Sequence, residues 1–323
     1  MSKKAEISLN IKARRIVNKL MDDENRLGVS VYASGDGSTI IDAGVEAEGS
    51  FEAGLLVTEI CMGGMGRARI GLEEYDRLML PTVFVETSRP CEALLGSQFA
   101  GWRIEVEDYY AMASGPARAL ALKPKKIFEE IQYREEADEA VIVLESDKLP
   151  TPKALRHIAE KCSVNPDRLY AVVTPTSSLV GSVQISGRIA ETGMHRLVTL
   201  GLDPKVFKHA AGKAPVAPSH PDSKIAMGRT NDVLLYGGET FFIVEADMDE
   251  ERLREIVDKA PSSSSRDYGK PFYEIFRDAG YDFYKIDPAL FAPAALTLCN
   301  LKDGKVYSAG TVNREVLRKA MGC

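Results

Sequence analysis

EAVIVLESDKLPTPKALRHIAEKCSVNPDRLYAVVTP, residues 139–175, combines two strand patterns with one helical pattern. Val, Ile and Leu dominate the short runs at 139–146 and 169–175, and each run predicts a β-strand. Between them, residues 151–162 have the apolar spacing of an amphipathic helix. Strands and helices that alternate along a chain are typical of α/β proteins, so this stretch predicts that fold class.

Further patterns on both sides of this stretch extend the prediction. LMLPTVFVET (78–87) predicts a strand, and GVSVYASGDGSTIIDAG (28–44) alternates and then turns at Gly-Asp-Gly. DVLLYGGETFFIVEA (232–246) predicts a strand with a Gly-Gly turn in its middle. An amphipathic pattern predicts a helix over 7–25. Hairpin signals of this kind indicate mixed rather than purely parallel sheets.

The length of the chain fits two domains with a substantial core, since it has 323 residues. We expect an N-terminal α/β region over 1–165 and a C-terminal α/β region over 166–323. The boundary is approximate, and segments of the two regions are free to interleave.

Charge and hydropathy exclude several classes of partner. The net charge of −6 gives no support to nucleic-acid binding, which favours a basic protein, and it argues weakly against an anionic membrane surface. No apolar run reaches the roughly 18–20 residues of a membrane span. The first 26 residues contain basic side chains but no apolar core of a signal peptide. We therefore expect a cytoplasmic protein with neither a nucleic-acid nor a membrane partner.

The cysteines and histidines do not form a recognisable metal motif. Five cysteines are widely scattered without a CxxC pair, and none of the four histidines belongs to an HExxH motif. The sequence therefore predicts no metal site.

The stretch PTSSLVGSVQISGRIAETGMHRLVTLG (175–201) predicts a helix over 177–200 with one narrow polar strip. At about 100° per residue, four polar side chains fall within an arc of roughly 60°. These are Gln184, Arg188, Glu191 and His195. Two interpretations stay open: a solvated strip with a weak ion pair three residues apart, or a buried strip that faces a cleft.

Two other segments contain candidate ligand-binding side chains. Arg229 and Asn231 lie at or just before the strand predicted over 232–246, where loop residues often bind ligands. Lys270 and Tyr284 belong to an aromatic-rich segment that could line a pocket for a flat ligand. Neither GxGxxG nor GxSxG occurs, which disfavours dinucleotide-binding and α/β-hydrolase interpretations.

Five long segments together resemble methenyltetrahydromethanopterin cyclohydrolase, a one-carbon enzyme of methanogenic and related archaea and of some methylotrophic bacteria. They are spread along nearly the whole chain, which makes the resemblance far more specific than one short motif. They are VEAEGSFEAGLLVTEICMGGM (45–65), DYYAMASGPARALALKPK (108–125), PTSSLVGSVQISGRIAETG (175–193), AMGRTNDVLLYGG (226–238) and DYGKPFYEIFRDAGYDFYKIDPALFAPA (267–294).

The resemblance implies the fold, the assembly and the reaction. It implies two α/β domains with a substrate pocket between them, and a homotrimer. The implied reaction is the reversible hydrolysis of 5,10-methenyltetrahydromethanopterin to 5-formyltetrahydromethanopterin. It needs no metal and no cofactor beyond this one-carbon carrier, which is the substrate. The catalytic arginine and glutamate of the family correspond to Arg188 and Glu191.

In the expected mechanism, Glu191 is the general base and acid, and Arg188 positions it. The remaining candidates for substrate binding are Gln184, His195, Arg229, Asn231, Lys270 and Tyr284. A non-catalytic pterin-binding or carrier protein on the same scaffold is the alternative. A metal-dependent amidohydrolase is disfavoured because the ligand motifs are missing.

Overall fold

The computed structural model describes residues 8–323, which form two compact units with one six-stranded sheet in each. Of the described residues, unit 1 comprises 8–67 and Cys91–Gln184, and unit 2 comprises Ala68–Pro90 and Ile185–Cys323. Both sheets are mixed, so the α/β prediction with mixed sheets is confirmed. The sequence analysis placed an approximate boundary at residue 165 with segments free to interleave; in the structure the chain passes from one unit to the other after residues 67, 90 and 184. Residues 68–90 join unit 2 because one of their strands pairs with a strand of that unit.

The sheet of unit 1 has the strand order β1-β2-β8-β7-β6-β5. Strands β2, β8 and β7 run parallel, and the other neighbours are antiparallel. The strands predicted over 139–146 and 169–175 are β7 and β8, and the hairpin predicted over 28–44 is β1 and β2. The strand bounds are β1 Ser30–Ala33, β2 Thr39–Asp42, β5 Trp102–Val106, β6 Tyr109–Ser114, β7 Ala140–Glu145 and β8 Leu169–Val173.

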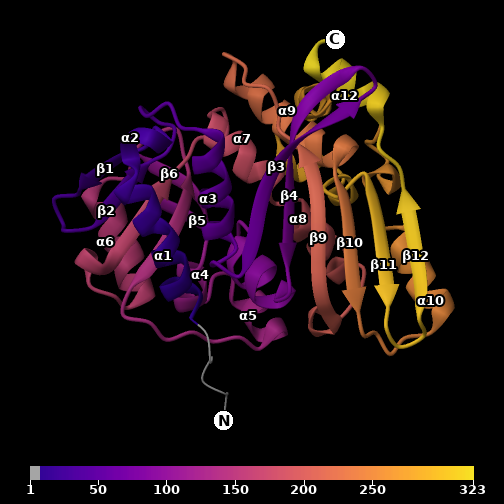
Figure 1. Ribbon diagram of the computed structural model, residues 1–323, viewed down its shortest axis with the longest axis horizontal. Helices are drawn as coiled ribbons and strands as arrows, with labels where there is room; N and C mark the ends of the chain where they lie inside the picture. Colours follow the sequence, from indigo (N-terminus) through magenta and orange to yellow (C-terminus); the bar gives the residue numbers. More distant parts are fainter. Residues whose placement is uncertain (1–7) are drawn as a thin grey trace. The chain divides into compact units, whose positions relative to one another are not determined.

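Helices cover both faces of this sheet, because alternate residues of a strand point to opposite sides (Figure 1). Val141 and Val143 of β7 pack with apolar side chains of α1 and α3, whereas Ile142 and Leu144 pack with those of α6. The helix expected over 7–25 is α1, and residue 7 lies outside the described residues. The helix bounds are α1 Leu9–Asp22, α2 Glu24–Leu27, α3 Phe51–Cys61, η1 Cys91–Gln98, α4 Ala117–Ala121, α5 Lys125–Ile131, α6 Pro152–Cys162 and η2 Pro166–Arg168.

The sheet of unit 2 has the order β12-β11-β10-β9-β4-β3. Strands β10 and β11 run parallel, whereas β9 pairs antiparallel with β10 and β4, and β12 pairs antiparallel with β11. The strand predicted over 78–87 is β4. The bounds are β3 Gly66–Tyr75, β4 Leu78–Thr87, β9 Phe207–Pro215, β10 Glu239–Val244, β11 Ala295–Asn300 and β12 Lys305–Gly310.

The two faces of the unit 2 sheet differ in exposure. Helices pack against its strands, and Figure 1 shows the strands in front of α8 and α10. In β10, Phe242 is fully buried, whereas its neighbour Phe241 is 43% exposed on the other face. The helix bounds are α8 Ile189–Thr199, η3 Pro204–Val206, α9 Ser223–Gly237, α10 Glu250–Asp258, η4 Ser262–Ser264, α11 Phe272–Asp278, η5 Phe283–Lys285, η6 Pro288–Leu290 and α12 Arg314–Met321.

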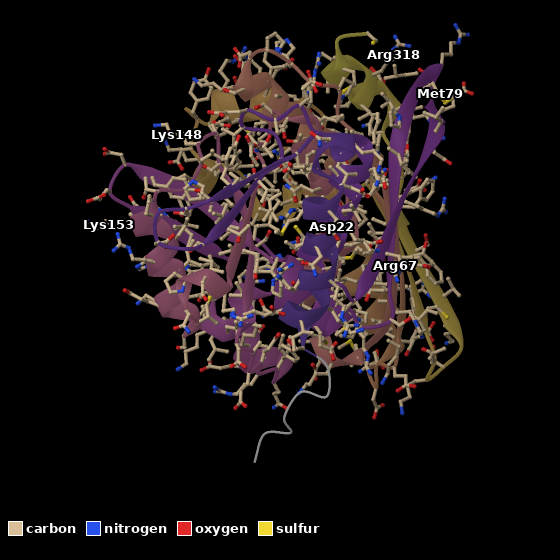
Figure 2. All side chains as sticks on the ribbon, turned by 60° about the vertical axis from the view of Figure 1, so that its left-hand side comes forward. Asp22, Arg67, Met79, Lys148, Lys153 and Arg318 are labelled. Carbon is tan, nitrogen blue, oxygen red and sulfur yellow. The ribbon has the colours of Figure 1, made fainter. Side chains whose placement is uncertain are left out.

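A long hairpin of β3 and β4 ends at a two-residue turn. Asp76 and Arg77 both have positive φ, as a tight hairpin turn requires. The Asp76 carboxylate pairs with the Arg318 guanidinium of α12 at 3.2 Å, which ties the tip to the last helix. Figure 2 shows Met79 and Arg318 at this end of unit 2, where Met79 is largely exposed.

The strand predicted over 232–246 is wrong in its first half. Residues 223–237 form helix α9, and only Glu239–Val244 form a strand. The helix is capped by Asp222, whose carboxylate accepts hydrogen bonds from the N–H groups of Lys224 and Ile225. The last two turns of α9 are buried on all sides, so its apolar run has no helical periodicity to distinguish it from a strand.

A buried carboxyl group joins α9 to α11. Asp232 is 1% exposed, and its Oδ1 accepts a hydrogen bond from the N–H of Phe272 at 2.7 Å. Burial raises the pKa of Asp232 to about 8, although the Phe272 hydrogen bond and the nearby Arg229 act in the opposite direction. Asp232 is therefore protonated in the folded protein at neutral pH.

This pKa predicts how stability depends on pH. In the unfolded chain the carboxyl has its ordinary pKa of about 4, so the unfolded state loses this proton first as the pH rises. The contribution of Asp232 to stability is therefore fully present below about pH 4 and is lost as the pH rises through about 8. Asp232→Asn keeps an acceptor oxygen but does not titrate. We expect a Tm that is higher than that of the wild type at pH 8 and falls less between pH 5 and pH 8, measured by differential scanning calorimetry.

Asp222→Asn is the matched control, because this exposed residue caps the same helix and Asn caps as well as Asp. It should reproduce the pH dependence of the wild type. A D232N variant with the wild-type slope of Tm against pH would contradict the prediction.

Candidate functional site

The single helix predicted over 177–200 is two helices. α7 spans Leu179–Ser186 and α8 spans Ile189–Thr199, and Arg188 is the N-cap residue of α8. The Ser186 hydroxyl donates a hydrogen bond to the carbonyl of Pro215 in β9 at 2.7 Å, which fixes the end of α7 to the sheet of unit 2. The Ser186-Gly187 pair explains the break, because Gly has low helix propensity and such pairs are common at kinks.

The break divides the predicted polar strip. Gln184 precedes it, whereas Glu191 and His195 follow it on α8. Gln184 is fully buried in unit 1, where the thiol of Cys61 lies 3.9 Å from its Oε1. The predicted arc assumed one continuous helix. Because the helix is broken, Gln184 does not share a polar strip with Arg188, Glu191 and His195.

Arg188, Glu191 and His195 lie together in the first two turns of α8. Arg188 is 8% exposed and Glu191 is 7% exposed, and His195 is half-buried. The backbone continues without distortion, since Thr192 donates from its N–H at 2.9 Å and from its hydroxyl at 3.1 Å to the carbonyl of Arg188. Of the two interpretations of the strip, the solvated one is wrong for Arg188 and Glu191, because both are buried.

The environment of Glu191 suits a carboxylate. It lies in the first turn of α8, where the helix dipole and the backbone N–H groups favour negative charge. Charged side chains are rarely this buried unless they are paired or have a function. Glu191 and His195 are four residues apart on the helix, so their side chains lie on the same face.

Four other predicted site residues lie elsewhere in unit 2. Arg229 and Asn231 are on α9, not at the start of a strand. The Arg229 guanidinium donates to the carbonyl of Met321 at 3.1 Å, and the Asn231 amide donates to the carbonyl of Met227 at 2.9 Å. These bonds give both side chains a structural role in α9 and at the end of α12.

Lys270 and Tyr284 are surface residues of unit 2. The Lys270 ammonium lies 3.6 Å from the carboxylate of Asp278, and Tyr284 is 97% exposed. The structure does not group either of them with the α8 residues, and their role in substrate binding stays a prediction.

The carboxyl edge of the parallel strands in unit 1 is a structured feature that the sequence analysis missed. Asp42 ends β2, and its carboxylate accepts hydrogen bonds from the four backbone N–H groups of residues 44–47. At the end of β7, Glu145 accepts a hydrogen bond from the hydroxyl of Thr176. Ligands of open α/β sheets bind at this edge. The Asp-Ala-Gly sequence after a predicted strand was the available signal.

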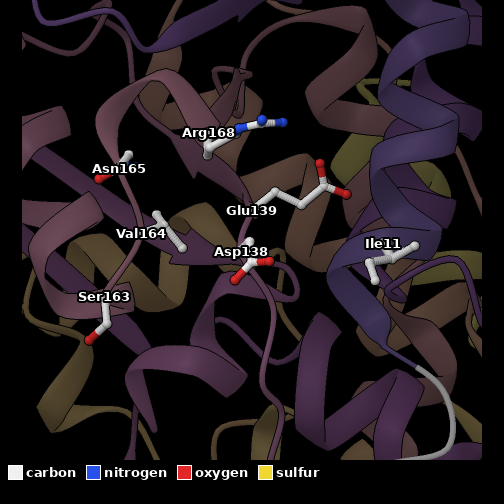
Figure 3. Close-up of a pocket in the computed structure, with 7 residues that line it drawn as sticks. All are labelled: Ile11, Asp138, Glu139, Ser163, Val164, Asn165 and Arg168. Atoms are coloured by element: carbon white, nitrogen blue, oxygen red, sulfur yellow. The ribbon is translucent and has the colours of Figure 1, made fainter.

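A pocket of about 530 Å³ lies at the opposite, amino edge of β7 and β8 in unit 1 (Figure 3). It holds none of the predicted site residues and lies away from the edge where α/β sheets bind ligands. We therefore do not assign the substrate to it. Its lining residues are Ile11, Asp138, Glu139, Ser163, Val164, Asn165 and Arg168.

The described part of the chain contains no group of three or more His, Cys, Asp or Glu side chains arranged to hold a metal ion. Within the same residues, no helix is long and apolar enough to cross a membrane.

Comparison with known proteins places the whole chain in one family. A family model described as cyclohydrolase (MCH) matches residues 8–321. The chain is 46% identical over 319 residues to the methenyltetrahydromethanopterin cyclohydrolase of Methanothermobacter marburgensis, covering 98% of this chain and 99% of the relative. Relatives of the same name from Methanocaldococcus jannaschii and Methanococcoides burtonii are 46% and 45% identical, with 98% of both chains covered in each case. The resemblance found in the sequence is confirmed, and this chain belongs to the methenyltetrahydromethanopterin cyclohydrolase family of enzymes.

Proposed function

We propose that this enzyme catalyses the reversible hydrolysis of 5,10-methenyltetrahydromethanopterin to 5-formyltetrahydromethanopterin, with Glu191 as the proton-transfer group. The observation that carries the proposal is the buried pair Arg188 and Glu191 at the first turn of α8. The names of relatives at about 45% identity supply the substrate.

The substrate defines what the protein must supply. Its methenyl carbon belongs to a resonance-stabilised amidinium cation, so it is already electrophilic, whereas neutral water is a poor nucleophile. As water adds to this carbon, the carboxylate of Glu191 takes one proton from it. The tetrahedral adduct then collapses: a C–N bond breaks, the departing nitrogen receives the proton from Glu191, and the second water proton is released as the formyl C=O forms.

Arg188 has a positioning role in this proposal. A guanidinium next to a cationic substrate is repulsive, so attraction to the substrate does not explain an arginine. Its planar fork of N–H groups is suited to holding a carboxylate in one orientation. It is also suited to donating a hydrogen bond to the oxygen that becomes the formyl group.

A non-catalytic pterin-binding or carrier protein is the alternative, and it is not favoured. A carrier would not need a proton-transfer group. The absence of Arg188 or Glu191 would have indicated a carrier protein. Both Arg188 and Glu191 are present and buried.

The role of Glu191 can be tested by substitution. Glu191→Gln keeps the shape of the side chain but removes the base, so kcat should fall by about 10²–10⁴, the usual contribution of general acid–base catalysis. The substrate should still bind. The loss of methenyl absorbance on hydrolysis measures the rate. Glu251→Gln is the control, because it removes an exposed carboxylate from the first turn of α10 and should leave kcat unchanged.

Arg188→Ala extends this prediction to the pair. It should also lower kcat, and the double variant with Glu191→Gln should lose less than the product of the two single losses, because the residues act as a unit. If Glu191→Gln kept nearly full kcat with the pH profile of the wild type, the proposed role of the pair would be wrong.

We also propose that the reaction needs no metal and no redox cofactor. The substrate already carries the positive charge that a Lewis acid would otherwise provide. Exhaustive chelation should therefore leave turnover unchanged. A large loss of activity that Zn²⁺ restores would refute this.

The assembly that the resemblance implies is a homotrimer, and we propose it for this chain. Exposed apolar side chains such as Phe241 on β10 and Val306 on β12 are available for a contact between copies. Light scattering at micromolar concentration should give the mass of three 35.4 kDa chains. A stable monomer under these conditions would contradict the proposal.

A further inference from the structure

Ile189 fixes the first turn of α8 to the sheet of unit 2 by filling a space between two glycines. It is fully buried and lies between Arg188 and Ala190 in the sequence. A Cβ atom at Gly212 of β9 would lie 2.9 Å from Ile189 Cγ2 and 3.4 Å from the backbone nitrogen of Ala190. A Cβ atom at Gly238, just before β10, would overlap Ile189 Cδ1. The first turn of α8 therefore approaches the strands closely at both glycines.

Neither the dihedral angles of Gly238 nor the strand pairing of Gly212 requires glycine. Gly238 has φ −80° and ψ 136°, which any residue adopts. Gly212 is paired regularly with Val85 of β4 and Thr240 of β10, inside strand β9. Glycine inside a strand weakens it and often marks the close approach of another segment. Space for Ile189 is therefore one reason for glycine at both positions. A Cβ atom would also lie 2.6 Å from the carbonyl oxygen of Leu234 at Gly238 and 3.1 Å from that of Glu239 at Gly212.

A third glycine continues the contact from the helix side. Gly193 follows Ile189 by one helical turn, and a Cβ atom there would lie 3.1 Å from the ring of Phe242 and 3.1 Å from Thr240 Cγ2. The turn that carries Glu191 is therefore held at both ends against β9 and β10.

These contacts set the direction of the Glu191 side chain. Consecutive residues of a helix are about 100° apart, so Glu191 lies about 200° around the axis from Ile189. It points away from the sheet, and any lift or rotation of this turn moves it directly. Arg188 is bonded to Ile189 and moves with it.

We propose that Gly212 and Gly238 are positioning residues that act through Ile189 to place Glu191 and Arg188 for proton transfer. This inference rests on the proposed function. A methyl group at Gly212 would push the first turn of α8 outward, and a displacement of about 1 Å can cost up to about 10² in rate.

The experiment starts with Gly212→Ala in the full-length enzyme. We expect kcat to fall by about 10–100-fold while KM changes by less than about threefold, because binding contacts outside this turn are retained. Ile189→Ala added to Gly212→Ala removes the obstructing Cγ2 and should restore kcat at least about tenfold, although the missing side chain lowers Tm. A general folding defect would not give recovery of kcat together with a lower Tm.

A second comparison tests whether the effect passes through Glu191. In an enzyme that already carries Glu191→Gln, Gly212→Ala should cause almost no further loss of kcat. Gly193→Ala should give the same pattern and replaces Gly212→Ala if that variant does not fold, since Ala is the better helix former. Gly71→Ala is the control: it adds a methyl 3.2 Å from the ring of Phe84 on the neighbouring strand β4, and it should leave kcat unchanged.

Each outcome separates this inference from the proposed function. A wild-type enzyme that does not open the methenyl substrate refutes the proposed function. An inactive Glu191→Gln variant together with fully active Gly212→Ala and Gly193→Ala variants refutes only the positioning role. The positioning role is also refuted if Gly212→Ala lowers kcat by the same factor in the Glu191→Gln enzyme as in the wild type and Ile189→Ala does not restore kcat.

Discussion

The close contact between the first turn of α8 and strands β9 and β10 is the constraint on which the candidate site depends. Interiors are packed as densely as crystals, so a helix can lie this near to a sheet only where side chains are missing. Gly212 and Gly238 leave space that Ile189 fills, and Gly193 leaves space for Phe242 and Thr240. These contacts fix the distance of α8 from the sheet and the rotation of α8 about its own axis. The buried carboxylate of Glu191, on the side of the helix that faces away from the sheet, therefore has one defined direction.

This arrangement suits the proposed chemistry. An amidinium substrate provides its own electrophile, so the protein must supply proton transfer and accurate placement rather than a Lewis acid. Placement on a packed helix is more exact than placement on a loop. The Ser186 hydroxyl bond to Pro215 anchors the residues before the pair, and the glycine contacts anchor those after it. Arg188 lies between these two anchors, at the cap of α8.

Much of the fold was predictable, because strands and amphipathic helices have different apolar periods. The strands at 139–146, 169–175 and 78–87 and the hairpin at 28–44 are β7, β8, β4 and the β1–β2 pair. Prediction failed where burial removes that periodicity. The run 232–237 is buried on all sides in α9 and was assigned to a strand. The helix over 177–200 was predicted as continuous because its apolar pattern runs through Gly187, whereas the chain breaks there.

The fold class, the family and the two residues of the proposed catalytic pair were predictable from sequence patterns, because they depend on local periodicity and on long matching segments. The surroundings of these residues were not predictable in this way. Only folding brings Arg229 to the carbonyl of Met321, directs Asn231 to that of Met227 and leaves Tyr284 almost fully exposed. Only folding brings Gly212 and Gly238 to Ile189 from distant parts of the chain. Contacts of this kind depend on strand pairing and helix packing between residues far apart in sequence, and no local pattern records them.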